Sequence, residues 1–446
     1  MANNNTAFIP ELWAQESLRI LEANTVMTNL VYRDFNSAVA SFGQTVNTRK
    51  PAEFIAGGKI DGEDVTNQDA TATNIAVVLN HHLHTSFVIF DGEESKSFQE
   101  LRAFYLEPAM LSISQKIDEI LCGQVYQFLA NSVGRLGLAV SEDTVIDAQG
   151  AMNILKVPFA NRNLVVPPAM HSDLLRDDIF VSAERVGDNG TALREGSLGT
   201  KFGFKIFMDQ NMPSIPTAGL VKVLGAINLV AGYSAGTTTF VVDGFSAAII
   251  NGSYITIAGD DTPLLVSSTV GGATPTSITV ATASKRDVVD NAVVTVYTPT
   301  AINFGAGYSA GWHKEIVVDS APTKIGQLLT VGANSYASTK SLTAPSATIL
   351  KTDKNLVASV ADNDVVGLGP AGNYGLAFTK NALAMVNRPL ALPMAGSVLS
   401  AVASYNDLSI RVVIDYDSKV QGHRVTVDML MGTKVLDSAL GTVVLG

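Results

Sequence analysis

The feature that most constrains the fold is an abrupt change in residue usage after Pro213 and Pro216. Between residues 229 and 304 the chain contains 13 Thr, 11 Val and 7 Gly, but no Glu and no Met. Residues that favour helices are therefore scarce, and β-branched residues dominate. Turn signals separate short runs that we predict to be strands at residues 238–242, 254–258, 277–281 and 292–297. We expect an all-β barrel or sandwich in this part of the chain.

The segments on either side of this region show mixed patterns. Apolar residues recur at three- and four-residue steps over residues 93–133, which predicts a long helix that Pro108 should kink or split. Further patterns predict helices at residues 148–155, 172–177 and 377–386, and strands at 163–166, 202–208, 410–416 and 424–430. An all-β domain inserted into an α+β core explains this order with the fewest assumptions.

The N-terminal part of the chain is predicted to form an extended arm. An amphipathic helix is expected after Pro10, and residues 45–80 predict a long two-stranded hairpin with a polar tip. A hairpin of this kind buries little of its own surface. In an assembly we expect it to lie on a neighbouring subunit.

Composition favours self-association. The chain has 446 residues, of which only 16% are charged, so much of its surface is neutral and can be buried against other chains. The net charge of −11 argues against a protein that binds nucleic acid tightly by neutralising phosphates. Neither a secretory signal nor a run of eighteen apolar residues is present, so we expect folding in the cytoplasm and no membrane partner. The single cysteine, Cys122, lies among apolar residues and is interpreted as a buried thiol.

Two glycine-containing motifs match patterns found in enzymes, but the residues around them argue against an enzymatic role. The pentapeptide GYSAG occurs at residues 232–236 and again at 307–311, and it matches the nucleophile elbow G-x-S-x-G. That elbow needs a strand before the serine and a helix after it, whereas β-branched residues follow here, so two equivalent turns are favoured. Residues 367–372 match G-x-G-x-x-G, but Pro370 and the lack of an acidic residue about twenty positions further on favour a linker.

The evidence for a metal site in the sequence is equally weak. Three histidines lie close together without the partners of a zinc site, and two acidic pairs lack the ligand spacing of a calcium loop. These residues are His81, His82 and His84, with Asp260 and Asp261, and Asp362 and Asp364. We therefore predict a protein that is not an enzyme, with no catalytic, cofactor-binding or metal-binding residues.

Two short stretches carry a family resemblance. One is YGLAFTKNAL at residues 374–383, followed by VNRPL at 386–390. The other comprises SIRV at 409–412, DYD at 415–417 and RVTVDMLMG at 424–432. Together with the order of elements, these stretches resemble the major capsid (coat) proteins of tailed bacteriophages with the HK97-type fold. The likeness is to the podovirus-like branch, which carries an inserted β-domain.

This resemblance implies a division of the chain into named parts. It places an N-terminal arm at residues 1–48, an extended loop at 49–90, and a spine helix with the first part of the peripheral domain at 91–144. An axial domain follows at residues 145–216, an inserted β-domain at 217–372 and the axial return at 373–405. The C-terminal strands of the peripheral domain occupy residues 406–446.

The resemblance also implies a function. Many copies, arranged as pentamers and hexamers, would form an icosahedral virion shell around double-stranded DNA, which the acidic chain would contact only weakly. Assembly in the host bacterial cytoplasm would involve a scaffolding protein and a portal protein, and a decoration protein could bind outside. The alternatives are another β-rich virion component, such as a tail or decoration protein, and, third, a serine hydrolase.

Six residues are candidates for contacts between subunits. Some relatives crosslink a loop lysine to a neighbour's asparagine; Lys50 and Lys59 lie in the expected loop, although no pattern here supports a crosslink. We also predict that Asp260 and Asp261 pair with Lys285 and Arg286 across adjacent subunits.

Overall fold

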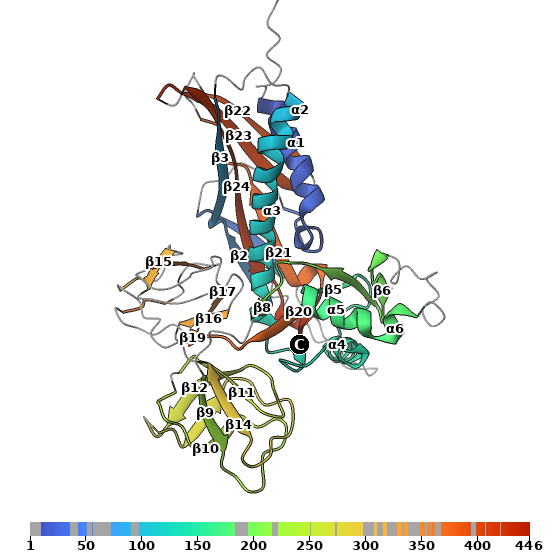
Figure 1. Cartoon of the computed structure of the whole chain (residues 1–446), viewed down its shortest axis with the longest axis vertical. Helices are drawn as coiled ribbons and strands as arrows, with labels where there is room; N and C mark the ends of the chain where they lie inside the picture. The colour runs from blue at the N-terminus through green and yellow to red at the C-terminus, as the bar shows by residue number, and fades with distance from the viewer. Residues whose placement is uncertain are drawn as a thin grey trace, which may run out of the picture. The chain divides into compact units, whose positions relative to one another are not determined.

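The computed structural model divides the chain into two compact units. Unit 1 comprises Met1–Ala23, Tyr32–Ile113 and Leu383–Leu436, and unit 2 comprises Asn24–Val31, Ser114–Ala382 and Asp437–Gly446 (Figure 1). The structure describes residues 10–35, 43–50, 56, 73–90, 98–182, 195–215, 222–249, 251–272, 274–297, 307–309, 315–318, 328–331, 334–337, 348–352, 356, 358–361, 367–393, 398–405, 407–419 and 421–446.

Unit 1 is built on a five-stranded antiparallel sheet with the long strand β24 at its centre. One edge of β24 pairs with β3, and the other edge pairs first with β23 and then with β21, while β22 extends the sheet beyond β23. The predicted strands at residues 410–416 and 424–430 are confirmed within β23 and β24. The bounds are β3 (His81–Phe90), β21 (Leu383–Arg388), β22 (Leu399–Tyr405), β23 (Leu408–Asp417) and β24 (Gly422–Val435).

Helices pack on this sheet through aromatic side chains. The ring of Phe87 on β3 lies 6.0 Å from that of Trp13 and is stacked 5.6 Å from that of Tyr105. Trp13 belongs to α1 (Pro10–Asn24), which confirms the helix expected after Pro10. Tyr105 belongs to the long helical segment that follows β3 in the chain.

That segment changes its geometry next to Pro108. A short α-helix, α2 (Phe98–Leu101), passes into a π-helical turn, η4 (Arg102–Leu106), and then into α3 (Glu107–Cys122). Proline has no N–H, and its ring collides with the carbonyl group four residues earlier, so a wider turn relieves the clash. The 3-10 helix η5 (Gly123–Phe128) ends the segment, five residues before the predicted end.

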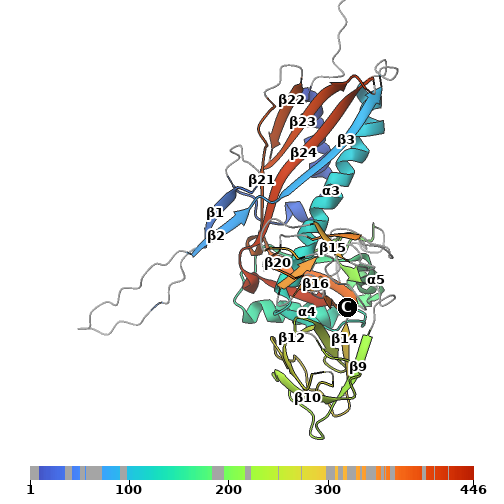
Figure 2. The same ribbon diagram turned by 90° about the vertical axis from the view of Figure 1, so that its left-hand side faces the viewer.

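The predicted hairpin at residues 45–80 begins and ends as an antiparallel ribbon. Strands β1 (Thr45–Lys50) and β2 (Thr73–Val78) pair only with each other among the described strands. Figure 2 shows this ribbon projecting to one side of the unit 1 sheet. Its base is anchored because Val46, Val77 and Leu79 pack with Val386 and Leu430.

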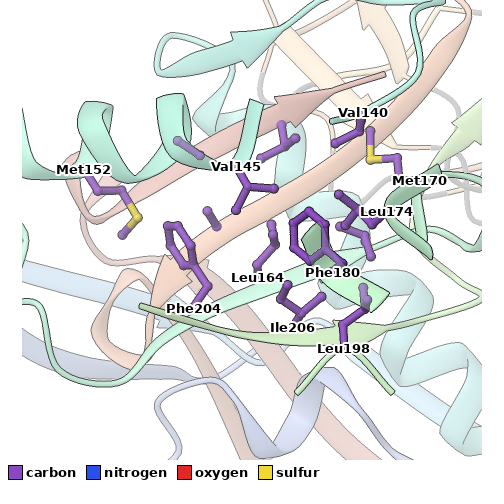
Figure 3. Packing of buried hydrophobic residues seen from close by; sticks show 14 of the residues in the cluster. Val140, Val145, Met152, Leu164, Met170, Leu174, Phe180, Leu198, Phe204 and Ile206 are labelled. Atoms are coloured by element: carbon purple, nitrogen blue, oxygen red, sulfur yellow. The ribbon is translucent and has the colours of Figure 1, made fainter. Parts of the chain in front are cut away.

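Unit 2 contains a mixed seven-stranded sheet in the order β4-β25-β20-β5-β7-β6, with β8 paired to β20. Helices α4 and α5 contribute to the core on this sheet, where Val145, Met152, Leu174, Phe180 and Phe204 are fully buried (Figure 3). The strands are β4 (Ser132–Gly134), β5 (Arg162–Val166), β6 (Thr200–Lys201), β7 (Phe204–Met208), β8 (Ser214–Ile215), β20 (Gly372–Thr379) and β25 (Gly441–Leu445). The helices are η2 (Met27–Asn29), α4 (Glu142–Ile154), α5 (Pro168–Arg176), α6 (Asp178–Val181), η6 (Lys380–Ala382) and η7 (Ser438–Leu440).

The helix predicted at residues 377–386 is wrong. The stretch is strand β20, the single 3-10 turn η6 and strand β21. β20 lies between β25 and β5, and Tyr374–Thr379 are all buried. A strand covered on both faces reads as a continuous apolar run, which periodicity cannot distinguish from a buried helix.

The Thr-rich region forms a closed six-stranded antiparallel barrel in the order β10-β13-β12-β11-β14-β9. All four predicted strands of this region are confirmed, and closure removes exposed edges. Its core includes Phe240, Ile255, Ile278 and Val294, all fully buried. The strands are β9 (Lys222–Ile227), β10 (Thr239–Asp243), β11 (Tyr254–Ile257), β12 (Leu264–Val270), β13 (Ser277–Val280) and β14 (Val293–Tyr297).

Two small sheets follow the barrel in the chain. β15 pairs with β18, and β16 lies between β17 and β19. An isolated antiparallel bridge joins Tyr308 to Val360. The bounds are β15 (Glu315–Val318), β16 (Leu328–Val331), β17 (Asn334–Ala337), β18 (Thr348–Lys351) and β19 (Gly367–Leu368).

Candidate assembly surfaces

The β1–β2 ribbon carries one of the two predicted loop lysines. Lys50 is the last residue of β1 and lies opposite Thr73 in the ladder, while Lys59 lies outside the described residues. On the ribbon the Asn74 amide donates to Asn47 Oδ1 at 3.2 Å, and both side chains are exposed. The ribbon therefore presents polar groups to its surroundings on one face.

The four charged residues that were predicted to pair between subunits lie close together within one chain. There they attach the barrel to residues 130–136. Lys285 Nζ donates to Ala130 O at 2.9 Å, and Arg286 Nη1 donates to Gly134 O at 3.2 Å. In return, the Leu136 N–H donates to Asp261 O at 3.0 Å. We call Asp260, Asp261, Lys285 and Arg286 the barrel clamp.

Asp260 holds the clamp together from inside. Its Oδ1 accepts the Lys285 N–H at 3.1 Å and its Oδ2 accepts the Thr262 hydroxyl at 2.6 Å. Burial raises the pKa of this carboxyl, although hydrogen bonds from Thr262, Lys285 and Arg286 oppose the shift. Pairing of these residues across adjacent subunits stays a prediction.

Exposed apolar side chains are numerous. Among the described residues, 21 large hydrophobic side chains are exposed, and Ile146, Ile154, Leu155 and Phe159 come from one stretch formed by α4 and the turn after it. Ile154 is 82% and Phe159 59% exposed. Exposed apolar side chains that come from one short stretch are candidates for a surface that binds another protein.

Phe159 is held in place by a buried arginine. The Arg162 guanidinium lies 5.0 Å from the centre of the Phe159 ring and donates to Pro158 O at 3.0 Å and Val157 O at 2.6 Å. Burial lowers the pKa of Arg162. The turn is thus rigid, and a rigid exposed aromatic ring costs little side-chain entropy when it is buried by a partner.

A groove of about 500 Å³ lies in unit 1 between α1 and the edge strand β22. Glu11, Gln15 and Arg19 line it from the helix, and Val402 and Tyr405 line it from the strand. β22 pairs only with β23 among the described strands.

The serines of the repeated pentapeptide occupy turns. Ser234 is exposed, and the chain after it enters β10 rather than a helix. Gly232 has φ +66°, and a side chain there would meet Val288 O. Ser309 is also exposed and lies before β15. The strand–serine–helix arrangement of a nucleophile elbow is absent at Ser234.

The histidines lie on β3, where Asp428 binds one of them. His82 Nε2 lies 3.2 Å from Asp428 Oδ2, and Arg411 donates to both oxygens of the same carboxylate. Burial pushes the pKa of Asp428 up, but the hydrogen bonds from His82 and Arg411 outweigh it, and the pKa lies below its ordinary value. Within the described ranges, no group of three metal-binding side chains occurs, and no helix is long and apolar enough to cross a membrane.

A buried acidic cluster in unit 2 was not predicted from the sequence. Cys122 is fully buried, as expected, and its thiol lies 3.6 Å from Asp209 Oδ2. Burial raises the pKa of Asp118 to about 7, with a contribution from Asp209. The only sequence signal was an acidic residue at an apolar helix position, since Asp118 lies between Ile117 and Ile120.

Comparison with known proteins identifies phage capsid structures as similar to this chain. One is "Mycobacterium phage Che8", with 13% identity, a TM-score of 0.42, and coverage of 94% of this chain and 90% of that chain. Another is "Capsid structure of the Cyanophage P-SCSP1u", with 11% identity, a TM-score of 0.42 and coverage of 94% and 88%. A third is "Asymmetric unit of bacteriophage PhiM1 mature capsid", with 10% identity, a TM-score of 0.38 and coverage of 93% and 86%. No family model and no curated protein sequence matches the chain.

Proposed function

We propose that this chain is the major capsid protein of a tailed bacteriophage, and that its copies form pentamers and hexamers of an icosahedral shell around double-stranded DNA. The observation that carries the proposal is the projecting β1–β2 ribbon. A two-stranded ribbon is marginally stable alone, and among the described residues Val46, Val77 and Leu79 anchor this one at its base. The described strands β1 and β2 gain burial by lying on a second copy.

The surface of the chain supports the same proposal. A subunit of a closed shell needs several different patches that meet different patches on neighbouring copies. The described part of the chain exposes large apolar side chains in both units, including Phe104 and Tyr405 in unit 1 and Ile154 and Phe159 in unit 2. The low charged fraction of 16% reduces the desolvation cost of burying such patches.

The charge fits a container for DNA. A net charge of −11 gives little attraction to phosphates, so the shell wall contacts the packaged DNA weakly. The proposal includes a scaffolding protein, a portal protein and assembly in the host bacterial cytoplasm. Within the HK97-type fold, residues 49–90 are the extended loop and residues 217–372 are the inserted β-domain.

The experiment is expression with and without the candidate scaffolding protein, followed by negative-stain microscopy. We expect closed shells of uniform size. Replacing residues 51–72 by a short Gly-Ser turn keeps the anchored base of the ribbon, so we expect unchanged thermal unfolding of the subunit and no shells. Fibres would identify a tail component instead, and a monomer under all conditions would refute the shell.

A further inference from the structure

The repeated pentapeptide is part of a longer repeat. Residues 226–236 read AINLVAGYSAG and residues 301–311 read AINFGAGYSAG, with nine identities in eleven positions. A second match follows in the same order, VVDNAVV at residues 288–294 against VADNDVV at 360–366, with five identities in seven. Shared Val and Gly content does not produce two such matches in the same order.

The repeated tyrosines make equivalent contacts. Tyr233 exchanges two backbone hydrogen bonds with Val288, at 2.7 and 2.8 Å, and Tyr308 does the same with Val360, at 2.9 and 2.8 Å. The hydroxyl of Tyr233 accepts the backbone N–H eight residues further on at 2.8 Å. The hydroxyl of Tyr308 accepts the N–H nine residues further on, also at 2.8 Å.

Three strand ladders correspond in register. β15–β18 matches β10–β13, β16–β17 matches β11–β12, and β16–β19 matches β11–β14, all antiparallel. One partner in each ladder keeps the spacing of the second sequence match: Ile278 and Leu350, Leu264 and Tyr336, and Val296 and Leu368 each lie 72 residues apart, as Val288 and Val360 do. Phe240 opposite Ile278 corresponds to Ile316 opposite Leu350, Ile255 opposite Leu264 to Leu329 opposite Tyr336, and Ile255 opposite Val296 to Leu329 opposite Leu368.

The copies differ at the barrel clamp. The β11–β12 connection that carries Asp260 and Asp261 has six residues, whereas β16 and β17 are joined by two. Val357 and Ala358 occupy the sequence positions of Lys285 and Arg286. The second copy instead contacts η5 through β17.

We infer that residues 301–368 are a second, tandem copy of the barrel module formed by residues 222–297, and that only the first copy is fastened by the clamp. The proposed inserted β-domain at residues 217–372 therefore consists of two modules in series. The second module is an addition that the first does not need in order to fold.

The chain path fits an added module. Ile215 pairs with Gly372, and Lys222 pairs with Tyr297, so the first module begins and ends at one place. Six residues join Ile215 to Lys222. Removing residues 298–366 leaves five residues, 367–371, between Tyr297 and Gly372, which is a return connection of similar length.

The first test is this deletion in the full chain, followed by hydrogen exchange. We expect the amides of β11 and β14 to keep the protection they have in the parent protein. Loss of that protection in a protein whose other sheets remain protected would show one interdependent domain and overturn the inference. Microscopy of the same variant tests the proposed shell separately, and we expect particles. The expectation that the second module is dispensable for assembly rests on the proposed function. A folded variant that forms no particles therefore counts only against that function.

A matched pair of core substitutions tests the inference without changing chain length. Phe240 and Ile316 are equivalent and both fully buried. Phe240→Asp should increase exchange in β10–β14 and leave β15–β19 protected, and Ile316→Asp should do the reverse. If either substitution exposes both sets of strands, the two segments are not separate modules.

Discussion

The Val26 N–H donates to Asp118 Oδ2 at 3.0 Å, so a buried carboxylate on α3 binds the turn that follows α1, 92 residues away in the chain. Hydrogen bonds from the backbone of Met27 and Thr28 to the same group help to keep its negative form, but burial and Asp209 outweigh them. The attachment of this turn is therefore sensitive to pH.

Asp118 should make the protein less stable as pH rises from its ordinary pKa of 3.8 to about 7. In this window the unfolded carboxyl is ionised and the folded one still holds its proton, so the folded state binds more protons. The slope for one such group is about 1.4 kcal/mol per pH unit. Urea unfolding between pH 4 and 8 checks this, with Asp118→Asn expected to flatten the profile. Parallel profiles for the two proteins would contradict it.

Breaking the buried ion pair of the unit 1 sheet should be costly. Arg411→Ala leaves the Asp428 carboxylate, whose side chain is 4% exposed, without its bidentate partner, and we expect a loss of about 3–5 kcal/mol. Arg424→Ala is the matched control on the same pair of strands, because Arg424 and its partner Asp417 are much more exposed. We expect at most about 1 kcal/mol there. Equal losses by urea unfolding would argue against this assignment.

Charge reversal at the barrel clamp distinguishes attachment of the barrel within one chain from pairing between adjacent subunits. Lys285→Glu with Arg286→Glu removes the bonds to Ala130 O and Gly134 O, so exchange of the Leu136 amide should increase in the isolated subunit. Lys205→Glu, at an exposed position on β7, serves as the control. Weakened particles made from subunits with unchanged exchange would instead support pairing across subunits.

In the repeated pentapeptide, we expect the tyrosines to contribute to stability and the serines to contribute neither to stability nor to catalysis. Tyr233→Phe and Tyr308→Phe each leave a backbone N–H without its acceptor, with an expected cost of about 1 kcal/mol to the module concerned. Ser234→Ala and Ser309→Ala should change neither stability nor any esterase background. A loss of esterase activity on either serine substitution would restore the hydrolase interpretation.

Phe159 should serve assembly rather than folding. Phe159→Asp places a charge on a ring position that is 59% exposed, so thermal unfolding of the subunit should change little while shells fail to form. Val270→Asp, at a 64% exposed position on the barrel, is the control for a new surface charge. Normal shells from the Phe159 variant would exclude this ring from the subunit interfaces.

Sequence patterns predicted elements well where local chemistry decides them. Alternation identified β23 and β24, and the loss of helix-forming residues identified the barrel strands. The same approach failed at β20 and β21, because a fully buried strand lacks alternation. The tandem module was detectable from the sequence, but only by extending the comparison beyond the pentapeptide to residues 226–236 and 288–294.

By itself, the sequence determined the α+β class, the β-rich region and the turn chemistry of the two GYSAG copies, because these depend on residues close together in the chain. Tertiary structure alone decided that Asp261, Lys285 and Arg286 bind residues 130–136 of the same chain, and that Asp118 binds the turn after α1. The physical reason is that charges and buried carboxyls find partners by distance in space, and no local pattern encodes which distant backbone groups lie within hydrogen-bonding reach.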